Sequence, residues 1–127
     1  MTHAIASIGR DHYATSIDFG GRGLTADEPA ERGGAGTGPA PYELLLASLG
    51  ACTAITLRMY ADRKEWPLET VAVELYLHGQ GETLSIERIV RPRGVDAQQA
   101  ARLIEIAART PVTLTLSAGV PIETRLG

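Results

Sequence analysis

The sequence is poor in the features that mark disulfide-bonded, membrane-spanning and nucleic-acid-binding proteins. It holds one cysteine, Cys52, so no disulfide can form within the chain, and a reducing compartment such as the cytoplasm is expected. Its formal net charge of -3 gives no reason to expect a nucleic acid or an anionic membrane as a partner. The first residues have neither the basic start nor the apolar run of a signal peptide. No uninterrupted apolar run reaches the ~18–20 residues of a membrane span.

Metal and phosphate sites also lack their usual ligands. The histidines His3, His12 and His78 are scattered, and one cysteine cannot build a Cys-rich zinc site. Residues 33–38 (GGAGTG) are rich in glycine but lack the lysine of a P-loop, so we interpret them as part of a flexible loop. We therefore expect neither a metal nor a cofactor.

What the chain does have is an apolar segment around Cys52. Between Leu44 and Leu57 the only polar residues are one serine and two threonines. We predict a helix from Pro41 to about Arg63, and because it is apolar all round, it should be buried on every side, by two layers of protein or by a second copy of the chain. Gly50 costs this helix about 1 kcal/mol relative to alanine, so we expect another backbone to approach it closely.

The other segments predict short strands and two shorter helical regions. Strands are expected at 3–8, 12–19, 23–27, 68–78, 83–90 and 121–126, with a loop at 28–40. Asp96 and Gln99 form a capping-box-like start for a helix that stops before Pro111, and residues 111–117 fit either a helical turn or a strand. The length suits one domain over 1–127, and the fold class is α+β with antiparallel sheets.

The end of the 83–90 strand is irregular. Its apolar alternation slips at Arg88–Ile89, which predicts a bulge or a change of exposure. The segment 91–94 (RPRG) is expected to break the strand.

Cys52 has two interpretations. Free cysteine often packs as a small buried hydrophobe, whereas a reactive thiol needs a cation or donor to stabilise its thiolate. The helix supplies no such group next to Cys52, so it must come from elsewhere in the chain or from a partner subunit. The arginines that precede the helix, Arg10, Arg22 and Arg32, are the available cations, although each also fits a solvated surface charge. Glu43 lies roughly 180° from Cys52 around the helix and suits its first turn.

Several segments resemble the OsmC/Ohr family, the osmotically inducible and organic hydroperoxide resistance proteins. They cover nearly the whole chain, at 25–29, 33–61, 64–69, 86–90 and 110–126. The most specific stretch is GPAPYELLLASLGACT, residues 38–53.

The resemblance implies an intertwined homodimer in which two central helices lie back to back, wrapped by sheets from both chains. It also implies reduction of organic hydroperoxides by a thiolate on that helix, matched here by Cys52. Arg10 matches the activating arginine best. The family's glutamate aligns with Tyr42, and Glu43 is its neighbour.

The chain departs from the family at Thr110. Residues 110–112 (TPV) stand where the family has a Cys-Pro-Val motif, so the second cysteine is missing. The leading hypothesis is therefore a one-cysteine, peroxiredoxin-like thiol peroxidase that needs an external thiol. The alternatives are a non-catalytic dimeric module that binds a small apolar ligand or electrophile near Cys52, and a purely structural cysteine.

Overall fold

The computed structural model describes residues 2–127, whose backbone contacts form two compact units, Met1–Leu45 and Leu46–Gly127. The model is α+β with antiparallel sheets, as predicted. The expectation of one domain over 1–127 stays a prediction.

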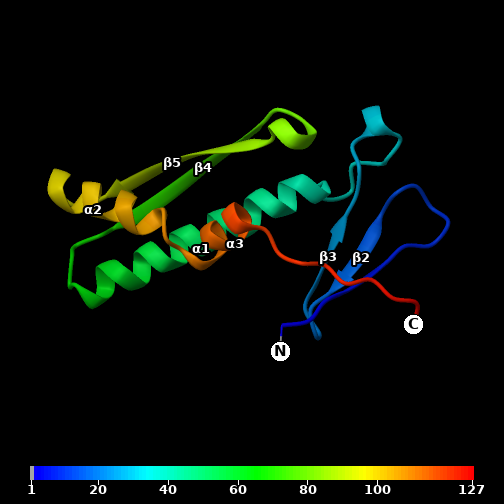
Figure 1. The fold of residues 1–127 in the computed structure, drawn as a ribbon, viewed down its shortest axis with the longest axis horizontal. Coiled ribbons are helices and arrows are strands. Elements are labelled where there is room, and N and C mark those ends of the chain that lie inside the picture. Colours follow the sequence, from blue (N-terminus) through cyan, green and yellow to red (C-terminus); the bar gives the residue numbers. More distant parts are fainter. Residues whose placement is uncertain (1) are drawn as a thin grey trace. The chain divides into compact units, whose positions relative to one another are not determined.

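The N-terminal unit contains the predicted three-stranded meander. Strands β1 (Ile5–Ser7), β2 (Thr15–Asp18) and β3 (Gly23–Ala26) pair antiparallel in that order (Figure 1). Gly20 and Gly21 turn the chain between β2 and β3 with φ angles of 79° and 96°, a conformation that favours glycine. Each strand is shorter than its predicted range.

A buried aspartate organises the loop that follows β3. Asp27 is 3% exposed, and its carboxylate accepts hydrogen bonds from the backbone N–H groups of Tyr13, Glu28 and Thr37 and from the Thr37 hydroxyl. These bonds hold the pKa of Asp27 at about 2, with the Thr37 hydroxyl as the largest cause. The predicted loop contains one 3₁₀ turn, η1 (Ala30–Arg32).

Helix α1, Pro41–Arg63, has the predicted bounds (Figure 1). Every fourth residue along one stripe is buried: Leu49, Thr53, Leu57 and Ala61. Within the single chain α1 is not buried on every side, because a second apolar stripe is exposed: Ala47, Ala51, Ile55 and Met59. Burial of this stripe by a second copy of the chain stays a prediction. By length and hydropathy alone α1 could also cross a membrane, a test that core helices of soluble proteins pass as well.

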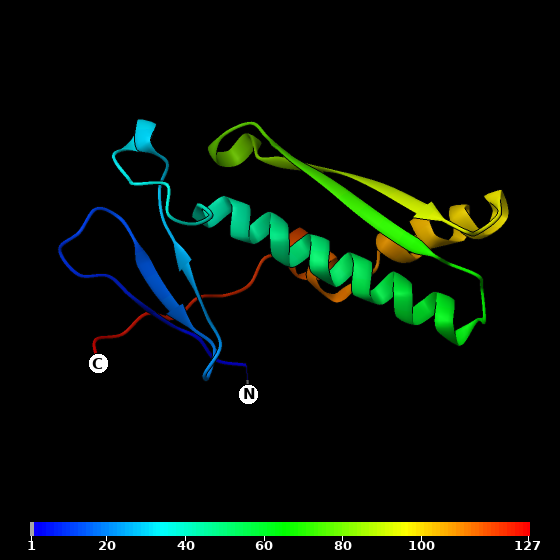
Figure 2. The same ribbon diagram turned by 180° about the vertical axis from the view of Figure 1, so that it is seen from behind.

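A long hairpin lies along α1 in both views (Figures 1 and 2). Strands β4 (Thr70–His78) and β5 (Ser85–Arg93) pair antiparallel over nine residues each, joined through the turn η2 (Gly81–Thr83). The pairing is unbroken from His78–Ser85 to Thr70–Arg93, so there is no bulge at Arg88–Ile89, and the predicted break at 91–94 is wrong. The predicted alternative, a change of exposure, is present: Ile89 is half-buried, whereas Glu87 and Arg91 on the same side of the strand are exposed. Pro92 is tolerated because both strands of a two-stranded sheet are edge strands.

The hairpin also explains Gly50. A Cβ atom at Gly50 would lie 2.9 Å from Cδ1 of Leu75, which projects from β4. The close approach is therefore made by a leucine side chain, and the expected backbone contact was wrong.

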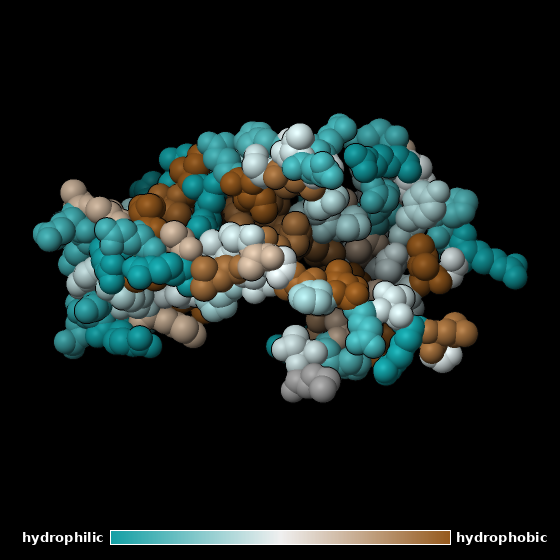
Figure 3. Space-filling model, in the orientation of Figure 1, coloured by the Kyte–Doolittle hydropathy of each residue, from teal (hydrophilic) through white to brown (hydrophobic). Residues whose placement is uncertain are grey.

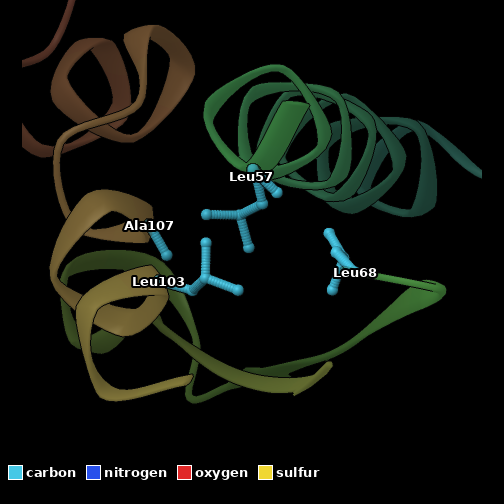
Figure 4. Close-up of a cluster of buried hydrophobic side chains, with 5 residues drawn as sticks. Leu57, Leu68, Leu103 and Ala107 are labelled. Carbon is cyan, nitrogen blue, oxygen red and sulfur yellow. The ribbon is translucent and has the colours of Figure 1, made fainter. Parts of the chain in front are cut away.

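The C-terminal unit also contains α2 (Ala97–Ala107), which contributes to its core, and α3 (Pro111–Ala118), which has no buried residue. Asp96 caps α2 in the predicted capping box with Gln99. Leu103 and Ala107 of α2 point toward Leu57 of α1 (Figure 4), and Leu57, Leu103 and Ala107 are each at most 2% exposed. Residues 111–117, ambiguous in sequence, are helical.

The predicted strand at 121–126 is absent from the part of the chain that the structure describes. A strand needs a neighbour for its backbone hydrogen bonds, and none pairs with this segment in the single chain. Its apolar residues are strongly exposed, with Ile122 at 89% and Leu126 at 99%.

Candidate functional site

Cys52 lies on α1 between the buried and the exposed stripe and is itself half-buried. Its neighbour Thr53 is fully buried and donates its hydroxyl proton to the carbonyl of Leu49, at 2.7 Å. The thiol is thus neither enclosed in the core nor freely exposed, so a small molecule can reach it while protein covers part of it.

Arg88 is the charged residue that the structure brings to this part of α1. It occupies the apolar side of β5, between Ile86 and Val90, and is half-buried. Its Nη1 donates to the hydroxyl oxygens of Thr53 and Thr113, at 3.0 and 2.7 Å, and its Nη2 donates to the carbonyl of Ala107, at 2.8 Å. Three helices therefore hold one guanidinium.

Arg88 and Cys52 interact electrostatically. Burial lowers the pKa of Arg88 from its ordinary value, and the charge of Cys52 opposes this lowering. An arginine keeps its proton in proteins, so the guanidinium is a permanent positive charge beside the only thiol of the chain. Such a charge favours the thiolate, which is the nucleophilic form of cysteine.

Thr110 stands where the family's second cysteine was expected. It is 1% exposed, and its hydroxyl oxygen lies 2.6 Å from that of Thr113. Although Thr110 is the residue before the first turn of α3, its side chain does not cap that helix and joins the hydroxyl pair instead. The position is therefore connected to Arg88 through Thr113.

The structure locates the predicted partners Arg10 and Glu43 in the N-terminal unit. Arg10 is exposed in the turn between β1 and β2. Glu43 is exposed in the first turn of α1, where its Oε1 accepts the backbone N–H of Ala40 at 2.9 Å, as its first-turn role predicted. Their assignment to the site of Cys52 stays a prediction.

The other predicted candidates are surface residues. Arg32 forms a 4.0 Å ion pair with Glu28, and Arg22 and Tyr42 are exposed. His78 contacts Glu87 at 3.0 Å on the hairpin. Among residues 2–127 there is no group of three or more His, Cys, Asp or Glu side chains that could hold a metal ion.

Sequence reasoning missed Arg88, Thr53 and Thr113. A signal for Arg88 was present, because residues 84, 86, 88 and 90 alternate as Leu, Ile, Arg and Val. An arginine on the apolar side of a strand is a buried charge that needs partners. No comparable signal marks the threonines, since nothing in the sequence brings α1, β5 and α3 together.

The comparisons with known structures support the same fold. The chain is similar to a putative osmotic stress induced and detoxification response protein from Psychrobacter arcticus, with 18% identity and a TM-score of 0.77 over 91% of this chain and 88% of that one. It is similar to an OsmC-like protein from Mycoplasma pneumoniae, with 17% identity and a TM-score of 0.75 over 92% and 87%. It is also similar to an organic hydroperoxide resistance protein OsmC from Legionella pneumophila, with 24% identity and a TM-score of 0.69 over 91% and 88%.

At these identities the structural likeness establishes the fold alone. No curated protein matches the chain by sequence. The family model described as OsmC-like protein matches residues 34–125, well over half of the chain and including Cys52, Arg88 and Thr110. The chain therefore belongs to the OsmC-like protein family.

Proposed function

We propose that the chain is a thiol-dependent peroxidase that reduces organic hydroperoxides through Cys52. The observation that carries the proposal is the position of the Arg88 guanidinium, which donates to Thr53, the neighbour of Cys52 in α1, and interacts electrostatically with Cys52. Family membership supports a redox or stress role, and the similar Legionella protein is named an organic hydroperoxide resistance protein. Arg10 and Glu43 are proposed as further groups that hold the thiolate active.

The proposed chemistry uses one cysteine. The thiolate of Cys52 attacks one oxygen of the hydroperoxide, an S–O bond forms, the O–O bond breaks, and the leaving alkoxide takes up a proton to give an alcohol. Thr110 supplies no sulfur, so the sulfenic acid condenses with an external thiol and releases water. A second external thiol then displaces the Cys52 thiolate from the mixed disulfide. The cytoplasm is the proposed compartment because its thiol pools supply this reductant.

We also propose that two copies of the chain associate through α1. Ile55 is 54% exposed and Met59 60% exposed, although α1 is apolar. Apolar side chains gather in the middle of the face drawn in Figure 3, and exposed apolar patches mark interaction surfaces. A second α1 would bury the exposed stripe, and the unpaired residues 120–126 could add to a sheet of the partner.

A peroxide-consumption assay tests the enzymatic proposal. Cumene hydroperoxide should be consumed in the presence of 2-mercaptoethanol, and Cys52→Ser should abolish turnover above the rate without protein. Equal turnover by Cys52→Ser and wild type would refute the proposal.

Light scattering tests the assembly. The wild-type chain should have the mass of a dimer, and Ile55→Glu should give a monomer or an unfolded chain because it charges the exposed stripe. Ile104→Glu is the matched control on α2, where the isoleucine is also exposed, at 49%. A well-folded wild-type monomer would contradict this assembly.

Thr110 favours one alternative. Because the second cysteine is absent, Cys52 could belong to a non-catalytic dimeric module that binds a small apolar ligand or electrophile. This alternative predicts that Cys52 is alkylated at the rate of an unactivated thiol and that no peroxide is consumed.

A further inference from the structure

The guanidinium of Arg88 is fixed by acceptors from three separate helices. Thr53 belongs to α1, Thr113 to α3, and the Ala107 carbonyl to the C-terminal end of α2. These three bonds use three of the five N–H groups of the side chain.

Thr113 is the residue on which this arrangement depends. Its hydroxyl oxygen lies 2.7 Å from Arg88 Nη1, 2.6 Å from the Thr110 hydroxyl and 3.2 Å from the Ala107 carbonyl oxygen. A hydroxyl has one proton and two lone pairs. If Arg88 and Thr110 both donate to Thr113, its own proton goes to Ala107, and every group of the cluster is satisfied.

We propose that Thr113 is a positioning residue, which holds the Arg88 guanidinium against α1 beside Cys52. The inference rests on the proposed function, in which Cys52 acts as a thiolate. Arginine is long and flexible, and ordering it costs rotamer entropy. A half-buried arginine without its anchor can move its charge toward solvent. Thr110 then has a role in place of the missing thiol, because its hydroxyl completes the anchor.

The test measures Cys52 alkylation by iodoacetamide at pH 7. Thr113→Val keeps the shape and removes the hydroxyl, so alkylation should slow by about 3- to 10-fold, the change expected when a nearby charge is partly lost. Thr113→Ser restores the hydroxyl and should restore the rate to within about twofold. Thr115→Val is the matched control, because Thr115 is exposed on the same helix, and it should leave the rate unchanged.

A double variant separates positioning from general damage. In the Arg88→Met background the Thr113→Val change should have no further effect on alkylation, because the charge that it positions is gone. Additive losses, an unchanged rate in Thr113→Val, or no rescue by Thr113→Ser would each overturn the inference. Urea unfolding verifies that each variant is folded, and Thr113→Ala provides the same test if the valine variant does not fold.

The two proposals can be refuted separately, because alkylation tests the positioning role of Thr113 and peroxide turnover tests the enzymatic function. If the alkylation results are as expected but the wild type consumes no peroxide, the proposed function is refuted and the positioning role stands. If peroxide is consumed but the alkylation rate of Thr113→Val equals that of the wild type, only the positioning role is refuted.

Discussion

Replacement of Arg88 by methionine should leave the fold intact. Methionine keeps an unbranched chain and removes the charge with all its donors. Hydrogen bonds from a charged group contribute about 1.5–3 kcal/mol each, but removing a buried charge also relieves its desolvation. Each acceptor keeps another partner: Thr53 bonds to Leu49, Thr113 to Thr110, and the Ala107 carbonyl to Thr113. We therefore expect a net change in unfolding free energy within about 2 kcal/mol.

The same replacement should slow the reaction of Cys52. An opposite charge near a thiol favours the thiolate, so removing the charge lowers the amount of thiolate. The thiolate that remains is more basic, and with a Brønsted coefficient of about 0.5 it regains roughly threefold in reactivity for each tenfold loss in amount. The alkylation rate should therefore fall, by about threefold for a tenfold loss of thiolate.

Intact-mass spectrometry after timed iodoacetamide treatment measures this rate directly, because the chain has one cysteine. Arg91→Met is the matched control: Arg91 lies three residues along β5, is exposed, and pairs with Glu74 at 2.8 Å. It should alkylate at the wild-type rate. Wild-type reactivity in folded Arg88→Met, or an equal loss in Arg91→Met, would refute the assignment of Arg88 to the thiol.

Three further predictions concern the scaffold. Leu57→Ala removes a fully buried side chain and should lower the unfolding free energy in urea by about 2–5 kcal/mol; a cost as small as that of exposed Ile104→Ala would contradict the core assignment. Asp27 has a folded pKa of about 2, below its ordinary 3.8. Its contribution to the free energy of unfolding is therefore complete above pH 3.8 and is lost as the pH falls toward 2. Asp27→Asn should remove this part of the acid unfolding profile, and an unchanged profile would contradict it. Gly50→Ala gains about 1 kcal/mol of helix propensity but brings Cβ to 2.9 Å from a methyl group of Leu75. Because that methyl is at the end of a flexible side chain, the thermal unfolding temperature should change little. A large decrease would mean that Leu75 cannot move.

Local signals predicted most of the fold. Pro41 marked the start of α1, the Asp96–Gln99 pair marked α2, and the two glycines at 20 and 21 marked the turn of the meander. Each of these depends on residues within one turn of one another, which a sequence displays directly. The central position of Cys52 followed from the apolar helix around it.

Features that depend on distant contacts were not predicted. The slip in alternation at Arg88–Ile89 predicted a bulge or a change of exposure, and no site, because the acceptors of Arg88, on α1, α2 and α3, are 19 to 35 residues away along the chain. Residues 121–126 have a strand-like pattern, but a pattern cannot supply the neighbour that a strand needs. Sequence reasoning thus selected Cys52 as a candidate and did not select Arg88.

The hydroxyl of Thr110, in place of a second thiol, affects how long Cys52 would stay oxidised. A second thiol in the same chain would act at a high effective concentration, on the order of millimolar, and would set the lifetime of the oxidised state from within. Buried Thr110 removes that internal reaction. If Cys52 works as proposed, the oxidised state lasts as long as the surrounding thiol concentration dictates. The fraction of chains in which Cys52 is oxidised then depends on the ratio of two outside concentrations, that of hydroperoxide and that of thiol.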